Sequence, residues 1–171
     1  MTLKEIQGLQ NYNTDKESTH HYLDVYEKLL APFKEKDVIN LLEVGIATGG
    51  SLKLWEEYFD NALIWGVDII NEIKYEYGAR VEIAFCDINE VTHSERDWDI
   101  AIDDGSHFVK DQLVFINLVW PSVRKGGLII IEDVHDLENN KQYFDALKIP
   151  YEIIDLRKTG IHCSVLLIFK K

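Results

Sequence analysis

The chain has 171 residues, and 46% of them are hydrophobic, which fits one soluble globular domain with a real core. Its net charge of −12 argues against a nucleic acid or an anionic membrane as partner, because phosphates are bound by basic patches. The first residues lack the apolar core of a signal peptide, and no apolar run approaches the ~20 residues that span a bilayer. Cys86 and Cys163 have no metal-ligand spacing, so we expect buried free thiols in a cytoplasmic protein.

The N-terminal part, residues 1–36, is expected to be a loop and a helix. Residues 1–19 are polar, and residues 11–16 are typical of a loop. From Thr19, which can cap a helix, apolar side chains recur at helical spacing at Tyr22, Val25, Tyr26 and Leu29. The remaining residues, 37–171, are expected to form the core of the same single domain.

The core alternates between apolar runs and helical patterns. Buried strands are predicted at residues 38–44, 62–68, 81–87, 98–103 and 128–131. Helices are predicted from Ser51, as a short polar segment after Asp68, over 109–123 and around 139–147, with Gly126 and Gly127 in the loop before the fifth strand.

Two further strands, 151–155 and 163–169, are joined by about seven residues, which is too short for a helical crossover, so they should pair antiparallel. The pattern predicts an α/β fold, a Rossmann-like doubly wound and mostly parallel seven-stranded sheet with an antiparallel C-terminal strand.

A glycine turn, Gly45-Ile-Ala-Thr-Gly49, follows the first predicted strand. It lacks the dinucleotide fingerprint G-x-G-x-x-G, because Ala47 holds the middle position, and it lacks the G-x-x-x-x-G-K-[ST] phosphate loop. Asp68 ends the second strand, where a carboxylate can accept both hydroxyl protons of a ribose, and Asp87 is placed to bind an adenine amine.

An acidic rim without a pyrophosphate site favours a cationic adenosine ligand such as S-adenosylmethionine over NAD. The predicted cofactor-binding residues are Glu43, Gly45, Gly49, Ser51, Asp68, Asp87 and Asp103.

Acidic residues also follow the fourth and fifth predicted strands. Asp104 follows one, and Glu132 and Asp133 follow the other. Neighbouring strand ends open onto one crevice, where three carboxylates repel each other unless a cation is present. Hard oxygen ligands suit Mg2+ or Mn2+. His107 lies three residues after Asp104 and can take a proton near neutral pH.

These residues resemble a known family. The glycine turn, Asp68 and the final antiparallel pair are similar to class I S-adenosylmethionine-dependent methyltransferases, and more narrowly to the macrocin and mycinamicin sugar O-methyltransferases. The narrower resemblance covers roughly residues 11–136. It is carried by Asn13-Thr-Asp-Lys16, Leu42-Glu-Val-Gly-Ile-Ala-Thr-Gly-Gly-Ser-Leu52, Trp55, Tyr58-Phe59, Asp103-Asp-Gly-Ser-His107 and Glu132-Asp133.

The resemblance implies methylation of a sugar or glycan hydroxyl of a secondary metabolite or polysaccharide, with S-adenosylmethionine and Mg2+ or Mn2+ bound. It implies Asp104, Glu132 and Asp133 as metal ligands, with His107 as the base and Asp104 and His107 as the catalytic pair. The chain is short against some relatives, which leaves the acceptor and the assembly state, including a homo-oligomer, open.

Two alternatives remain at this point. A catechol-like small molecule would also present a vicinal diol to the metal, and a cofactor-binding module without catalysis would belong to another class. Each proposed ligand also has a structural interpretation: Asp103 or Asp104 could cap the following helix, and Glu132 and Asp133 could be solvated loop acids. The remaining histidines are expected in surface or packing roles; they are His20, His21, His93, His135 and His162.

The N-terminal loop offers a further hypothesis. Tyr12, Asp15 and Lys16 could fold over the cofactor as a lid.

Overall fold

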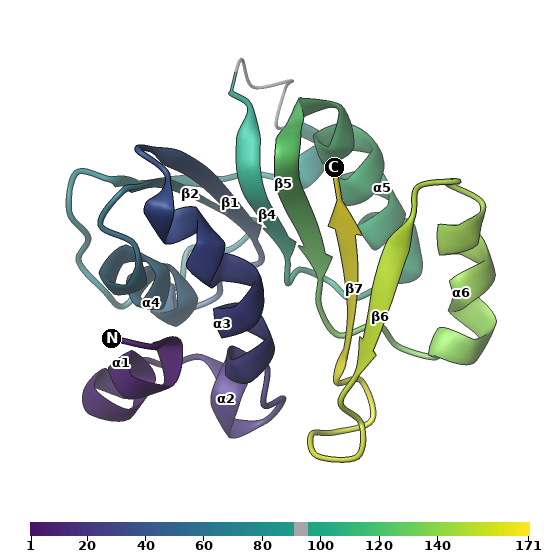
Figure 1. Ribbon diagram of the computed structural model, residues 1–171, viewed down its shortest axis with the longest axis horizontal. Coiled ribbons are helices and arrows are strands. Elements are labelled where there is room, and N and C mark those ends of the chain that lie inside the picture. Colours follow the sequence, from purple (N-terminus) through teal and green to yellow (C-terminus); the bar gives the residue numbers. More distant parts are fainter. Residues whose placement is uncertain (91–95) are drawn as a thin grey trace.

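The computed structural model describes residues 1–90 and 96–171. Its sheet has seven strands in the order β3-β2-β1-β4-β5-β7-β6 (Figure 1). Strands β1 to β5 run parallel, whereas β7 runs antiparallel to β5, and β6 antiparallel to β7. The Rossmann-like, mostly parallel fold is therefore confirmed. The strands are β1 (Ile39–Val44), β2 (Ala62–Asp68), β3 (Val81–Phe85), β4 (Trp98–Asp103), β5 (Val123–Ile131), β6 (Tyr151–Asp155) and β7 (Val165–Lys170).

Helices cover both faces of the sheet, as Figure 1 shows. On one face lie α1 (Leu3–Gln10), α3 (Leu23–Leu30) and α4 (Gly50–Tyr58), whose apolar side chains pack with those of one side of β1 and β4. On the other face, α5 (Val109–Val119) and α6 (Leu137–Asp145) pack against the alternate residues of the same strands. Both faces are buried, which explains the continuous apolar runs of the central strands.

The short helix α2 (Asp15–Ser18) lies near the ends of the arrows that mark β4 and β5 (Figure 1). Three short 3-10 helices complete the described structure: η1 (Ala31–Glu35), η2 (Ile88–Glu90) and η3 (Trp120–Ser122). No helix in residues 1–90 or 96–171 is both long and apolar enough to span a bilayer.

The N-terminal region is more helical than predicted. Helix α1 begins after Thr2, whose side chain caps the Glu5 N–H while the Glu5 carboxylate accepts from the Thr2 N–H. The expectation that Thr19 caps the next helix is wrong, because Thr19 ends α2 and α3 begins at Leu23.

The prediction of a helix after Asp68 is also wrong. Residues 71–78 form no helix, because their tyrosines pack and hydrogen-bond across to other segments. The Tyr77 hydroxyl donates to the Gly49 carbonyl at 2.8 Å, and the Tyr75 hydroxyl accepts from the Asn13 N–H at 2.7 Å.

Strand β5 begins at Val123, so the helix predicted to reach that residue ends early and Gly126 and Gly127 lie in the strand. Gly126 has φ +80°, and a Cβ on Gly127 would come within 2.8 Å of the Asp99 carbonyl oxygen. The two glycines therefore permit an irregular start to the strand, where the register with β4 shifts, rather than a loop.

Candidate active site

A cavity of about 640 Å3 opens at the carboxyl ends of β1, β2 and β4. This volume lies in the range of small-molecule sites. Its wall includes the glycine turn, the ends of β2 and β4, and residues 13–15 of the N-terminal segment. The predicted cofactor residues on its wall are Gly45, Ser51, Asp68, Asp87 and Asp103, and the predicted catalytic pair Asp104 and His107 lies there too.

The glycine turn is fixed by close backbone contacts. Gly45 has φ +84°, and a Cβ there would lie 2.0 Å from the Asp104 carbonyl oxygen, so only glycine fits. The Asp68 carboxylate accepts from the backbone N–H groups of Ile46 and Ala47 at 2.9 and 2.8 Å. Asp68 thus shapes the turn around the cavity and keeps carboxylate lone pairs for a ligand.

Two predicted cofactor residues do not line the cavity. Glu43 is fully buried behind Ser51, and its Oε2 accepts from the Ser51 hydroxyl and the Trp55 indole, both at 2.9 Å. Gly49 has φ +85° and begins α4 against Tyr77. Their assignment as cofactor ligands stays a prediction, and the described contacts give both a role in holding the turn.

The remaining acids on the wall differ in environment. Burial raises the pKa of Asp103 to about 7, and its Oδ2 is buried without a described hydrogen-bond partner. Asp87 is exposed, and hydrogen bonds from Asn89 lower the pKa of its carboxyl. The Asp103 oxygen therefore carries a desolvation cost that no described contact offsets.

The ends of β4 and β5 lie side by side, as the sequence predicted. The Glu132 N–H donates to the Asp103 carbonyl at 2.9 Å, which joins the two strand ends. Asp104, His107 and Asp133 each offer a ligand atom within 4.8 Å of the others, and so do Glu43, Asp104 and Glu132. Asp104 belongs to both groups, whereas Glu132 and Asp133 share no such group among the described residues, so the assignment of all three as ligands of one ion stays a prediction.

These side chains fit a divalent cation. Burial, opposed by Lys16, raises the pKa of Asp104 to about 7, and burial with the neighbouring Asp104 raises the pKa of Glu132 well above its ordinary value. Such buried carboxylates favour any cation that keeps them ionised. Carboxylate oxygens are the ligands that Mg2+ and Mn2+ prefer.

Sequence reasoning missed one cation of the site, the ammonium of Lys16. Lys16 is fully buried, and its Nζ lies 2.8 Å from Asp104 Oδ2, 2.6 Å from Glu132 Oε1 and 3.3 Å from a Glu43 oxygen. Burial opposes its charge, but the three carboxylates outweigh that effect and raise the pKa of Lys16. From the sequence, the role considered for Lys16 was that of a lid residue, because Asp104 and Glu132, which it contacts, are 88 and 116 positions away along the chain.

Three aromatic residues from the same part of the chain also reach the acids. The Tyr26 hydroxyl donates to Glu132 Oε1, and the Tyr22 hydroxyl donates to Asp133 Oδ1 at 2.6 Å. His20 Nδ1 lies 3.1 Å from the same Asp133 oxygen. His20 is therefore buried as expected for a packing residue but has the acidic neighbour that the sequence did not reveal.

His107 lies beside this cluster in a form suited to a base. Its Nε2 is 3.9 Å from Asp133 Oδ2, and its Nδ1 is buried without a described partner. Burial lowers the pKa of the imidazole, which keeps it neutral near neutral pH. His107 and Asp133 both have left-handed backbones, with φ of 59° and 52°, a strained conformation that gathers at functional sites.

The other histidines divide by position. The His135 ring lies 6.1 Å from the His107 ring and 5.6 Å from the His162 ring, so the three rings lie in succession. Neither His135 nor His162 lines the cavity. His21 is exposed, and His93 lies outside the described residues. Cys86 and Cys163 are free thiols, as predicted, but the predicted burial is confirmed only for Cys163, because Cys86 is half-buried.

Sequence comparison finds curated relatives of one chemical type, although no protein-family profile matches the chain. A relative from Streptomyces olivaceus, the 8-demethyl-8-alpha-L-rhamnosyl tetracenomycin-C 2'-O-methyltransferase, is 30% identical over 77% of this chain and 39% of its own length. The demethylmacrocin O-methyltransferase of Streptomyces fradiae is 32% identical over 68% of this chain and 32% of its own length. The chain is a relative of the sugar O-methyltransferases. The predicted resemblance is thereby confirmed.

The fold comparison agrees. The MycE methyltransferase of the mycinamycin biosynthetic pathway, solved with Mg and SAH, superposes on all of this chain and 55% of its own, with a TM-score of 0.78 and 21% identity. This likeness shows the shared fold. The chain spans about a third to two-fifths of the length of the curated relatives and about half of MycE.

Proposed function

We propose that this methyltransferase relative is an S-adenosylmethionine- and divalent-metal-dependent O-methyltransferase that acts on a sugar or glycan hydroxyl. The observation that carries the proposal is the juxtaposition of Asp104, His107 and Asp133, within 4.8 Å of one another, with the cavity under the glycine turn. A cation site, a neutral base and a cofactor cavity at one sheet edge are the parts that methyl transfer to a hydroxyl needs.

The cavity supports a cationic adenosine cofactor. Asp68 stands at the end of β2 to accept ribose hydroxyls, and Asp87 lies beyond β3 to accept from the adenine amine. The partnerless Asp103 Oδ2 can accept from the cofactor's ammonium group. A wall with six aspartates favours a ligand that carries positive charge over an anionic dinucleotide.

The metal ligands proposed are Asp104, Glu132 and Asp133. A divalent ion bound there would supply Lewis acidity that lowers the pKa of an acceptor hydroxyl. His107 would remove the hydroxyl proton, while the residues of the cavity wall would bind the cofactor that supplies the methyl group. Proton removal needs a neutral imidazole, which the buried position of His107 provides.

The acceptor proposed is a sugar with vicinal hydroxyls, because the named activities of the relatives are sugar O-methylations. His135, whose ring lies 6.1 Å from that of His107, is the further polar group that we propose for contact with the acceptor. A catechol would meet the metal in the same way and is the competing acceptor class.

The test is transfer of a labelled methyl group from S-adenosylmethionine to a panel of glycosides and catechols, with and without chelator. We expect transfer to glycosides that is lost in chelator and restored by Mg2+ or Mn2+. Transfer that chelator leaves unchanged would contradict the metal dependence, and transfer to catechols alone would replace the sugar acceptor. If the cofactor fails to raise the melting temperature, the cofactor assignment is wrong.

A further inference from the structure

The acids at the β4 and β5 strand ends are each held by only one of their two oxygens. Asp104 is held at Oδ2, Glu132 at Oε1 and Asp133 at Oδ1. Within the part of the chain that the structure describes, no other oxygen of these three carboxylates accepts a hydrogen bond, and Asp133 Oδ2 has only His107 nearby, at 3.9 Å. The opposite oxygen of each carboxylate is thus left for another partner.

All the groups that hold these oxygens come from residues 16–26, a segment far away in the sequence. Lys16 reaches Asp104 and Glu132, while Tyr26 and Tyr22 reach Glu132 and Asp133. None of the three side chains lines the cavity. They are fully buried, and a buried lysine is rare unless its charge is paired.

We propose that Lys16, Tyr22 and Tyr26 are positioning residues that engage one oxygen of each predicted metal ligand and turn the other toward the divalent ion. This inference rests on the proposed function and adds the residues that orient its metal site. Groups that hydrogen-bond to metal ligands fix the orientation of those ligands. Loss of such a group usually weakens metal affinity by about 10–100-fold.

The positive charge of Lys16 has a second effect on the predicted metal site. Its ammonium lies among Glu43, Asp104 and Glu132, a group whose oxygens could themselves hold a metal ion. The lysine therefore acts as a built-in cation there and directs the divalent ion to the oxygens that it does not hold, on the side of Asp133 Oδ2, which lies 3.9 Å from His107 Nε2. Without its charge, the vacated group would be left with three buried and unbalanced carboxylates.

The tyrosines give the direct test, because phenylalanine removes only the hydroxyl. Binding of Mn2+ to the full chain is measured by isothermal titration calorimetry without cofactor or acceptor. We expect Tyr22→Phe and Tyr26→Phe each to weaken the affinity about tenfold. The matched control is Tyr58→Phe, whose hydroxyl donates to Glu27 at 2.9 Å, away from the site, and which should bind as the wild type does. Wild-type affinity in both tyrosine variants overturns the proposal.

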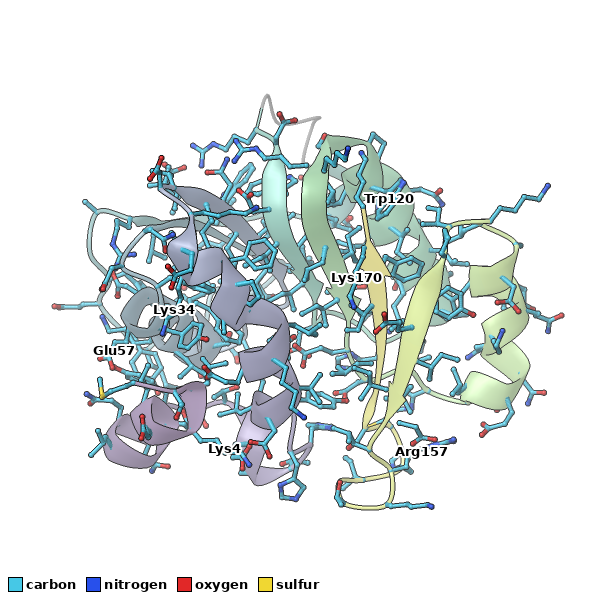
Figure 2. The ribbon with its side chains drawn as sticks, in the orientation of Figure 1. Lys4, Lys34, Glu57, Trp120, Arg157 and Lys170 are labelled. Atoms are coloured by element: carbon cyan, nitrogen blue, oxygen red, sulfur yellow. The ribbon has the colours of Figure 1, made fainter. Side chains whose placement is uncertain are left out.

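Lys16→Met tests the built-in cation by thermal unfolding in chelator and in Mn2+. We expect a lower melting temperature than the wild type in chelator, and a larger rise on adding Mn2+, because the ion can enter the vacated group. The control is Lys4→Met. Lys4, which is labelled in Figure 2, forms partly exposed ion pairs with Glu17 and Asp24. A Lys16→Met protein with the same rise as the wild type overturns this part.

Failure of the inference can be told from failure of the proposed function. If the wild-type chain does not bind Mn2+, both the proposed function and this inference lose their metal site. If the wild-type chain binds Mn2+ and both tyrosine variants bind it equally tightly, only the positioning role is wrong. If Lys16→Met does not fold in chelator, recovery of folded protein in Mn2+ supports the built-in cation, and no recovery contradicts it.

Discussion

The buried carboxylate of Glu43 offers a quantitative test of how the glycine turn is held. In Glu43→Gln the shape is kept, but the negative charge next to Lys16, 3.3 Å away, is removed. The amide oxygen can still accept from Ser51 and Trp55, which now donate to a neutral group, and such hydrogen bonds are roughly half as strong as charged ones.

The expected loss follows from these contacts. Breaking a buried ion pair costs about 3–5 kcal/mol, and the lower end applies because Lys16 keeps Asp104 and Glu132 as partners. We therefore expect the free energy of unfolding to fall by about 3 kcal/mol, which for a chain of this size lowers the melting temperature by roughly 6–12 °C. Because Glu43 lies off the cavity wall, the cofactor's Kd should change less than about threefold.

The assay is urea unfolding followed by tryptophan fluorescence near neutral pH, in chelator and without cofactor. Glu152→Gln is the charge-matched control, because Glu152 is exposed and pairs with Lys170, which is labelled in Figure 2. Surface pairs of this kind contribute about 0–1 kcal/mol. A Glu43→Gln protein as stable as the Glu152→Gln control would refute the reasoning. A cofactor Kd weakened more than about tenfold, without loss of stability, would instead restore Glu43 as a cofactor ligand.

Three further substitutions test the site. Asp104→Asn should abolish Mn2+ binding in calorimetry while the cofactor still raises the melting temperature, and retained metal binding would remove Asp104 from the ligand set. His107→Gln should lower kcat roughly 100-fold with little change in KM, as loss of a general base does. Because burial lowers the pKa of His107, wild-type kcat should rise with pH and level off below neutrality, since the base must be unprotonated; a plateau reached only above neutrality would contradict the assignment. Asp68→Ala leaves the Ile46 and Ala47 N–H groups without their acceptor and should weaken cofactor binding about 10–100-fold in a binding titration; unchanged affinity would exclude Asp68 from the cofactor site.

The strands and the edge of the sheet where the site lies could be predicted because buried parallel strands appear in a sequence as continuous apolar runs. Val38–Val44, Ala62–Asp68 and Trp98–Asp103 are apolar runs that end near acids, and the structure places strands there with only small shifts of their ends. The adjacency of β4 and β5, on which the acidic site depends, also follows from this topology.

The orienting residues could not be predicted because their signal is not local. Lys16, Tyr22 and Tyr26 look like ordinary positions of a polar loop and an amphipathic helix, and only the packing of the N-terminal segment on the sheet brings them to acids about 90 to 120 residues away. One local signal was missed by the sequence analysis. Thr2 and Glu5 have the spacing of a capping box, which predicts the start of α1.

Charge balance explains why a lysine belongs in the site of the proposed methyl transfer. Glu43, Glu132 and Asp133, which are buried, and the half-buried Asp104 would together carry four negative charges, and a divalent ion alone would leave two of them uncompensated. The positive charge of Lys16 reduces the number of uncompensated negative charges to one, which the positive charge of a sulfonium cofactor can balance. In the proposed reaction, loss of the methyl group would remove the positive charge from the cofactor, and the acceptor's proton would place one on His107, whose Nε2 lies 3.9 Å from Asp133 Oδ2. The position that would receive the positive charge therefore already faces a carboxylate, and the net charge of the site would stay the same before and after transfer.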